Sequence, residues 1–353
     1  MSPQPVTTPV RPAHRFDQDA LGAYLSEHLA GFHPPFSVVQ FEGGQSNPTF
    51  LMQDTVGRYV LRKKPPGKLL PSAHAVEREH RVMSALRGTA VPVCRMLLLC
   101  EDSEIIGTPF IVMEYVPGRV YHDPTLPGMP PSERGAIYRQ ACEVLAALHS
   151  IEPSAVGLER FGWAGNYYAR QISRWSRQYQ ASRTAELPEM NLLMEWLPRH
   201  IPDREETRIV HGDYRLGNMI LHPSEPRISA VLDWELSTLG DPVADLAYNL
   251  MTHYLPSRRH PTLARNDPAK TGIPGLRAQL ESYISASGRD PSEHWKFYLS
   301  FSMFRSAAIG QGVYKRGLDG NASSETALEL GREVASTASI AWALATGDLN
   351  PFG

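Results

Sequence analysis

The loop between Ile209 and Leu221 carries the clearest chemical pattern in this chain. It has the sequence His-Gly-Asp-Tyr-Arg-Leu-Gly-Asn over residues 211–218, between two short apolar runs. Phosphoryl transfer to an alcohol needs a carboxylate that accepts the hydroxyl proton and oxygen ligands for Mg²⁺. Asp213 and Asn218, five residues apart on one loop, can supply the first and part of the second. The alternative is a polar turn in which Asp and Asn serve turn geometry alone.

A second carboxylate follows fifteen residues after Asn218. The run Ile-Ser-Ala-Val-Leu at 228–232 predicts a strand, and Asp233 comes directly after it. Mg²⁺ prefers oxygen ligands and binds through one or two carboxylates beside phosphates, so a strand-end Asp suits it. An Asp that merely ends a strand is common, but the two patterns at this distance are far more specific together than either is alone.

The two patterns resemble those of the kinase-like phosphotransferases, typified by aminoglycoside phosphotransferases and choline kinases. Protein kinases have His-Arg-Asp and Asp-Phe-Gly where this chain has His-Gly-Asp (211–213) and Asp-Trp-Glu (233–235). The resemblance covers nearly the whole chain, residues 36–345. It implies a kinase that needs ATP and Mg²⁺ and phosphorylates a hydroxyl of a small molecule. The implied roles are catalysis for Asp213 and metal binding for Asn218 and Asp233.

A phosphate-binding cation is implied at the end of the predicted strand 59–62. Protein kinases place a lysine there, and this chain has Arg62 followed by Lys63. Strand alternation puts Val60 and Arg62 on one face and Lys63 on the other, although a bulge would exchange them. The sequence therefore leaves open whether Arg62 or Lys63 contacts phosphate. A solvated strand end is the alternative.

The position of Glu79 on its predicted helix also indicates a role in the site. On the helix predicted at 73–87, it shares an apolar stripe with Val76 and Met83. Burying an unpaired carboxylate is costly, so a buried Glu79 needs a cation, and the resemblance implies Arg62. The alternative is a solvated Glu79 at the edge of the stripe.

Two further segments complete the implied nucleotide site. The Gly-Gly-Gln-Ser-Asn loop at 43–47 matches the nucleotide-positioning loop, although a Gly-Gly pair alone indicates only a turn. By its position, the strand end at 113–116 corresponds to the hinge, the segment whose backbone would pair with the adenine edge. The implied ATP contacts are Gly44, Ser46, Asn47, Arg62, Glu79, Glu114 and Val116.

The segment Asp-Pro-Val-Ala-Asp at 241–245 predicts a helix start, with Asp241 as N-cap and Pro242 at the first helical position. Asp241 or Asp245 could brace the catalytic loop, but neither is expected to be catalytic. We interpret His211 as a packed loop residue and not a base.

The acceptor is expected to contact the C-terminal region, residues 251–353. This region has eleven Lys/Arg against nine Asp/Glu and is rich in aromatic residues, which suits an anionic or amphipathic acceptor better than a polycation. The chain looks closest to the kinase domain fused to acyl-CoA dehydrogenases, which implies a hydroxyacyl-CoA acceptor. Arg305 and Tyr314 are candidate contacts, with helix packing as the alternative. Aminoglycosides or other small alcohols are alternative acceptors.

Two other classes are disfavoured. A nucleotide-binding pseudokinase that serves as an interaction module would not need Asp213, Asn218 and Asp233 together. A protein kinase would have a long activation loop after Asp233, whereas Gly-Asp-Pro follows at 240–242.

The surrounding elements predict an α+β fold. Strands are expected at 36–41, 49–54, 59–62, 93–100 and 109–115, and mostly helices after them. Together with the resemblance, this order predicts a bilobal protein-kinase-like fold with a small β-rich N-lobe and a larger, mainly helical C-lobe. The predicted parts are a flexible lead at 1–16, a nucleotide-binding N-lobe at 17–116 and a C-lobe at 117–353, which holds the catalytic loop, metal site and acceptor-binding helices.

Composition excludes several other functions. Thirty-five Lys/Arg and 37 Asp/Glu give a net charge of −2, so nothing favours nucleic-acid or membrane-surface binding. No run of about 18 apolar residues predicts a membrane span. Three cysteines without metal-ligand spacing, and no apolar leader, favour a cytoplasmic setting. The expected partner is a small-molecule substrate, and the oligomeric state is left open.

Overall fold

The computed structural model describes residues 6–42, 47–65, 75–255, 261–320 and 327–352 of the chain. The chain forms two compact units. The first comprises Met1–Val120 and Asn218–Ser237, and the second comprises Tyr121–Gly217 and Thr238–Gly353. The first unit thus includes a segment that the predicted boundaries place in the C-lobe.

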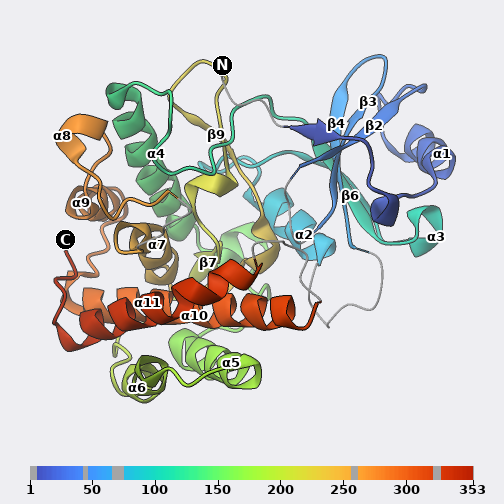
Figure 1. Cartoon of the computed structure of the whole chain (residues 1–353). Helices are drawn as coiled ribbons and strands as arrows, with labels where there is room; N and C mark the ends of the chain where they lie inside the picture. Colours follow the sequence, from blue (N-terminus) through green and yellow to red (C-terminus); the bar gives the residue numbers. More distant parts are fainter. Residues whose placement is uncertain (1–5, 43–46, 66–74, 256–260, 321–326, 353) are drawn as a thin grey trace. The chain divides into compact units, whose positions relative to one another are not determined.

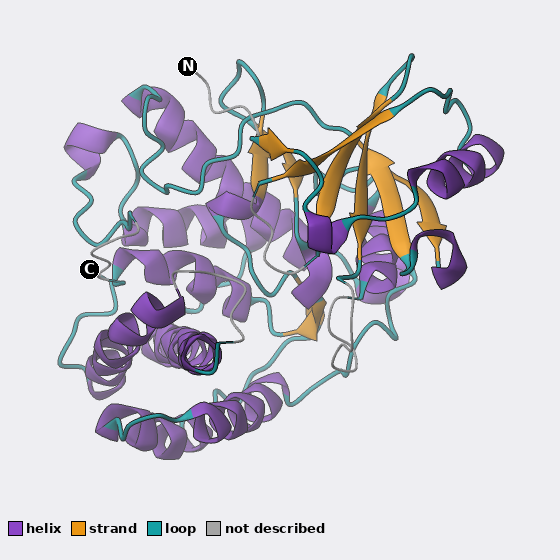
Figure 2. Cartoon of the chain, turned by 45° about the vertical axis from the view of Figure 1, so that its right-hand side comes forward, coloured by secondary structure: helices purple, strands orange, loops and turns teal. Residues whose placement is uncertain are grey.

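An antiparallel six-stranded sheet forms the centre of the first unit (Figures 1 and 2). Its strand order is β1-β2-β3-β4-β6-β5, and β2 to β6 form within the five runs that the sequence predicts as strands, to within a residue at their ends. The strands are β1 (Thr7–Thr8), β2 (Ser37–Phe41), β3 (Thr49–Gln53), β4 (Arg58–Lys63), β5 (Met96–Cys100) and β6 (Phe110–Glu114).

One face of this sheet packs on α1 (Gln18–His28) and the short α3 (Ser103–Ile106), which the sequence analysis missed. Leu21 and Leu25 of α1 join Phe50 and Leu61 of the sheet in one buried cluster. The helix α2 (Val76–Leu86) packs on β5 and β6.

The predicted flexible lead differs from the structure. Within its described part, β1 pairs with β2, with Thr7 opposite Phe41. The Phe16 ring meets Phe50 edge-on at 5.2 Å between ring centres. These residues therefore add to the sheet and its core.

The first unit also holds the hairpin of β8 (Met219–Leu221) and β9 (Ile228–Val231), followed by the 3-10 helix η5 (Trp234–Leu236). The hairpin joins its unit by backbone bridges from Val231 to Val93 and from Leu221 to Arg119. Gly118 lies so close to the hairpin that a Cβ there would be 2.3 Å from the Leu221 carbonyl oxygen.

The second unit is mainly helical (Figure 2). Its long central helix α10 packs along α11 and against α5 and α7, while α4 packs on α9. One small antiparallel ladder joins β7 (Arg208–Val210) to β10 (Thr238–Gly240), a strand that the sequence analysis missed. The helices are α4 (Pro131–Ser150), α5 (Tyr167–Ser182), α6 (Pro188–Trp196), α7 (Val243–Leu250), α8 (Pro268–Thr271), α9 (Leu276–Ser287), α10 (Trp295–Leu318) and α11 (Ala327–Thr346).

Candidate active site

Arg62 is the centre of a buried ion cluster in the first unit. Its Nε lies 3.1 Å from Oε2 of Glu79 on α2, and its Nη2 lies 2.5 Å from Oδ1 of Asp233. Oε2 of Glu235 lies 3.6 Å from the same Nη2. Burial alone would lower the pKa of Arg62, but the charges of Glu79 and Asp233 outweigh burial and raise it, so the guanidinium stays charged.

The regular pairing of β4 separates Arg62 from Lys63. Arg62 lies opposite Ile111 and Lys63 opposite Phe110, with no bulge between them. Lys63 is buried on the face that carries Leu61, with its Nζ 5.6 Å from the centre of the Phe16 ring. The Arg62 side chain is therefore the one that meets Glu79, as strand alternation predicts.

Glu79 is only 1% exposed, so the predicted apolar stripe does bury a carboxylate. Burial, opposed by Arg62 and reinforced by the charges of Asp233 and Glu235, raises the pKa of Glu79 to about 7. Burial is the main cause of the shift, and the other two carboxylates that share the Arg62 guanidinium add to it. The cluster consequently has an excess of negative charge and of oxygen donors.

Asp233 has a left-handed backbone with φ of 66°, which Asp tolerates better than most residues and which is frequent at functional sites. The next residue anchors this turn, because Trp234 is fully buried and its indole N–H donates to the Val231 carbonyl at 3.0 Å. The turn directs Asp233 to Arg62.

Asn218 stands at the same end of the β8–β9 hairpin as Asp233. Its carbonyl accepts the N–H of Leu232 at 2.8 Å, which extends the ladder by one step. Asn218 and Asp233 therefore offer an amide and a carboxylate oxygen from neighbouring strand ends. Oxygen donors beside an excess of negative charge fit Mg²⁺, which takes few protein ligands and completes its shell with phosphate and water.

The other predicted nucleotide contacts are placed as follows. Gly44 and Ser46 lie outside the described residues. Asn47 is buried, and its amide donates to Oε2 of Glu235 at 3.3 Å, while its own Oδ1 is buried without a partner among the described residues. Glu114 ends β6 and accepts the N–H of Arg95 at 2.8 Å, and Val116 follows it.

In the second unit, Asp245 pins the backbone of the catalytic loop. Its carboxylate accepts the N–H of His211 at 2.5 Å and of Gly212 at 2.8 Å, and lies 3.5 Å from Nε2 of His149. Burial alone would raise the pKa of Asp245, but the contact with His149 and the hydrogen bonds from the loop hold it below its usual value. The Tyr283 hydroxyl in turn lies 2.9 Å from Nδ1 of His149. Asp245 thus braces the loop, one of the two alternatives open from the sequence.

The loop presents Asp213 with a side chain that is 16% exposed. The Asp213 N–H donates to Nδ1 of His211 at 3.2 Å, and His211 is fully buried, as expected of a packed loop residue. The carboxylate accepts the Nε–H of Arg215 at 3.3 Å, and its charge, after burial, helps to raise the pKa of Tyr248. A fixed, partly exposed carboxylate of this kind can accept a proton from a bound hydroxyl.

Comparison with known proteins decides the family. The model of the phosphotransferase enzyme family matches residues 37–280, which is more than half of the chain. The chain belongs to the phosphotransferase enzyme family. Acyl-CoA dehydrogenase family member 10 of Mus musculus is 50% identical over 347 residues, covering 97% of this chain and 32% of the relative. This phosphotransferase therefore spans about a third of the length of that curated relative.

Solved structures agree with the predicted fold. A crystal structure from Ralstonia eutropha JMP134, assigned provisionally as an aminoglycoside phosphotransferase, is 48% identical with a TM-score of 0.86, covering 94% of this chain and 99% of that one. A thermostable mutant of the aminoglycoside phosphotransferase APH(4)-Ia, 17% identical, has a TM-score of 0.62 and covers 93% of this chain and 99% of its own. The predictions of a kinase-like fold and of a phosphotransferase are confirmed.

The predicted acceptor contacts of the phosphotransferase lie on α10. Arg305 is 6% exposed and donates from Nη2 to the Gly212 carbonyl at 2.6 Å. Tyr314 is half-buried, and its ring packs so closely on Gly331 of α11 that a Cβ there would be 2.4 Å from it. Their contact with an acceptor stays a prediction.

Asp241 binds differently from the predicted N-cap. The helix α7 begins at Val243, one residue later than expected, yet Asp241 still accepts the Val243 N–H at 3.0 Å. It also accepts the Tyr168 hydroxyl at 3.0 Å and the Glu206 N–H at 3.1 Å, so it joins three segments of the second unit.

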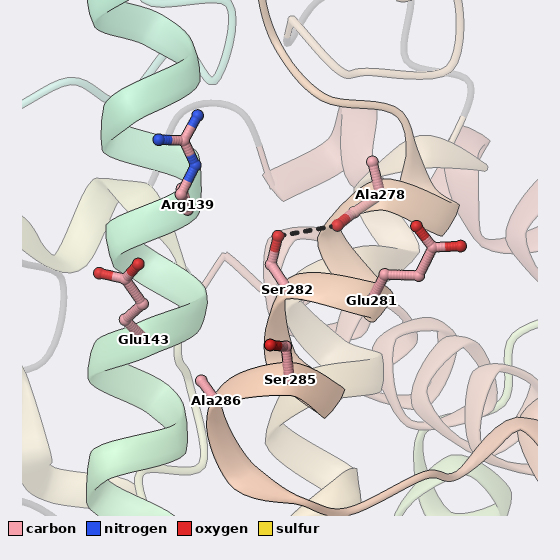
Figure 3. A pocket seen from close by; sticks show the side chains of 7 residues that line it. All are labelled: Arg139, Glu143, Ala278, Glu281, Ser282, Ser285 and Ala286. Atoms are coloured by element: carbon pink, nitrogen blue, oxygen red, sulfur yellow. Dashed lines mark hydrogen bonds between the residues drawn. The ribbon is translucent and has the colours of Figure 1, made fainter.

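A separate groove of about 500 Å³ lies between α4 and α9 of the phosphotransferase (Figure 3). Arg139 and Glu143 line it from α4 and Glu281 from α9, and none of the predicted site residues does. No described helix of the chain is long and apolar enough to cross a bilayer.

Glu235, His149 and Tyr248 were not predicted from the sequence as site residues. Glu235 had a usable signal, since it is the third residue of the Asp-Trp-Glu motif. Tyr248 had a weaker one, because it follows Asp245 by three residues on one helix and so shares its face. His149 had none, because it meets Asp245 across 96 residues of sequence.

Proposed function

We propose that this phosphotransferase transfers the γ-phosphate of ATP to a hydroxyl of an anionic or acyl-linked metabolite. Among such acceptors, we rank a hydroxyacyl-CoA first. The observation that carries the kinase part is the Arg62 cluster. A buried strand guanidinium is bracketed by Glu79 and Asp233, which is the arrangement of a phosphate-binding cation held by its helix partner.

ATP and Mg²⁺ are the proposed cosubstrate and metal. The APH(4)-Ia mutant structure is a complex with AMP-PNP and hygromycin B, which supports an adenine nucleotide for a chain of the same fold. Arg62, held by Glu79, would contact phosphate, and Asn47, Glu114 and Val116 would line the nucleotide. The proposed Mg²⁺ ligands are Asn218 and Asp233, and the bound ion would neutralise charge on the phosphates.

Asp213 is the proposed catalytic residue. Its carboxylate accepts the proton of the acceptor hydroxyl while the hydroxyl oxygen bonds to the γ-phosphorus. The bond from that phosphorus to the β–γ bridging oxygen breaks, and ADP leaves. Asp245 and His149 keep the loop backbone fixed, so little reorganisation is needed at the moment of transfer.

The acceptor class rests on two supports. Residues 251–353 carry more basic than acidic side chains and many aromatic ones. The mouse relative is named as an acyl-CoA dehydrogenase family member, so an acyl-CoA is the natural class for a phosphotransferase of half-identical sequence. Acceptors diverge quickly on one fold, which makes this the finer part of the proposal.

An aminoglycoside is the second candidate acceptor. The 48% identical structure, provisionally an aminoglycoside phosphotransferase, favours it. A polycation would need acidic side chains at the acceptor site, whereas Arg215 lies on the loop that presents Asp213 and Arg305 donates to that loop.

A coupled ADP-release screen tests the proposal. The acceptors are 4-hydroxyacyl-CoA thioesters of several chain lengths, kanamycin, choline, homoserine and simple sugars, each with Mg-ATP. We expect turnover on at least one hydroxyacyl-CoA and none on kanamycin. Robust turnover of kanamycin with none on any acyl-CoA would overturn the acceptor class. An absence of ADP release on every acceptor, with Mg-ATP still bound, would favour a nucleotide-binding pseudokinase.

A further inference from the structure

Arg305 is a buried cation directly beside the backbone that carries Asp213. From α10, its Nη2 donates to the carbonyl of Gly212 at 2.6 Å. Its guanidinium carbon lies 5.0 Å from the centre of the Tyr248 ring and 5.7 Å from that of Trp175. Aromatic faces attract a cation, so the two rings hold the guanidinium in place.

The charge of Arg305 is unusual for a residue that only packs. Among the described residues it forms no ion pair, and its Nε is buried without a hydrogen-bond partner. Burying a cation without a carboxylate is costly, and a neutral side chain could make the same single bond to Gly212 more cheaply. The guanidinium is therefore expected to serve something beyond helix packing.

Tyr248 links the same cation to the Asp213 side chain. The Asp213 carboxylate lies close enough to Tyr248 for its charge to act on the phenol. Burial and the Asp213 charge raise the pKa of Tyr248 above its usual value, so the phenol keeps its proton and is available as a donor to that carboxylate. Arg305 thus contacts both the residue before Asp213 and the ring of the tyrosine that interacts with the Asp213 carboxylate.

We propose that Arg305 and Tyr248 are positioning residues for Asp213. Arg305 fixes the backbone at Gly212 and the Tyr248 ring, and Tyr248 fixes the rotamer of the carboxylate. The inference rests on the proposed function, in which Asp213 accepts the hydroxyl proton. It gives Arg305 a role in the loop in place of the acceptor contact expected from the sequence. A displacement of about 1 Å at a reacting group can cost about 100-fold in rate.

The test measures ADP release with 4-hydroxypentanoyl-CoA and Mg-ATP. We expect Arg305→Gln and Tyr248→Phe each to lower kcat by about 10- to 100-fold, with KM for either substrate within about threefold. Arg305→Lys should recover part of the loss, because it restores the cation between the rings. The matched control is Tyr168→Phe, which removes a buried phenol-to-carboxylate bond elsewhere in the same unit and should leave kcat within about twofold.

Coupling between the two residues gives a second readout. If both residues act through Asp213, the kcat of the double variant Arg305→Gln/Tyr248→Phe should be only slightly lower than that of the slower single variant. Losses that multiply would overturn the proposal. A raised acceptor KM at unchanged kcat in Arg305→Gln would also overturn it, since Arg305 would then be an acceptor contact.

Hydrogen exchange makes the test independent of the acceptor. The amides of residues 211–214 should exchange at least about tenfold faster in Arg305→Gln than in wild type, with the global unfolding midpoint unchanged. Unchanged protection of these amides would contradict the inference. Asp213→Asn separates the two claims. If it matches wild type in ADP release, the proposed function fails. If it is inactive while Arg305→Gln is fully active, only this inference fails.

Discussion

Asp245→Asn should uncouple the catalytic loop from the helix that braces it. Asn has nearly the shape of Asp, so the change leaves no cavity and tests the hydrogen bonds and charge of the carboxylate. The carboxylate of Asp245 accepts the N–H groups of His211 and Gly212 and is 1% exposed. An amide has one acceptor oxygen instead of two, and its NH₂ group would face one of these donors.

The expected loss follows from these contacts. One hydrogen bond to a charged group contributes about 1.5–3 kcal/mol, and a buried N–H left without a partner costs about 1–3 kcal/mol. We therefore expect the free energy of unfolding to fall by about 2–5 kcal/mol. The loop would also lose its fixed backbone, so kcat should fall by about tenfold or more.

Urea unfolding at pH 7.5 measures the free energy of unfolding, and ADP release measures kcat. The matched control is Asp54→Asn in the turn between β3 and β4. Asp54 is 8% exposed and accepts the backbone N–H groups of His33, Val56 and Gly57, so it loses the same kind of bond. It should cost similar stability and leave turnover nearly intact. A loss of less than about 1 kcal/mol in Asp245→Asn would refute the reasoning.

Three further predictions concern other parts of the chain. Asp233→Ala should abolish Mg²⁺-dependent ATP binding, measured by calorimetric titration. Asn218→Ala should weaken that binding less, because a carboxylate holds the ion more strongly than an amide oxygen does. Equal affinities for wild type and Asp233→Ala would contradict the metal site. Burial lowers the pKa of His253 to about 4, so the folded chain binds fewer protons than the unfolded chain between pH 4 and 6.5. Its stability advantage over His253→Gln, measured by urea unfolding, should therefore shrink by about 3 kcal/mol on acidification through that window, and a constant difference would argue against it. Gly118→Ala should lower the free energy of unfolding by more than about 2 kcal/mol, because its Cβ would lie 2.3 Å from the Leu221 carbonyl oxygen and the backbone there would have to move. An unchanged melting temperature would disprove that contact.

The parts of the site that local periodicity controls were predictable. Strand alternation separated Arg62 from Lys63, and the apolar stripe on α2 located Glu79 as a buried carboxylate in need of a cation. Both inferences use spacing within one element, which the sequence shows directly.

The parts that depend on pairing between distant segments were not predictable. The strand β10 has three residues and exists only because β7 pairs with it, as Thr238 with Val210. The bond between Tyr283 and His149 joins residues 134 apart. Residues 1–16 were expected to be a flexible lead, yet Phe16 packs edge-on against Phe50 of the buried cluster, a contact between distant residues that local sequence does not show.

The most direct test of the central claim compares Asp213→Asn with wild type in two measurements on the same preparations. One is turnover of Mg-ATP with the hydroxyl acceptor that wild type uses best, and the other is Mg-ATP affinity by calorimetry. The account predicts that the variant loses at least about 100-fold in kcat while its Mg-ATP affinity stays within about threefold of wild type. Near-wild-type kcat in Asp213→Asn would contradict the assignment of Asp213 as the proton acceptor.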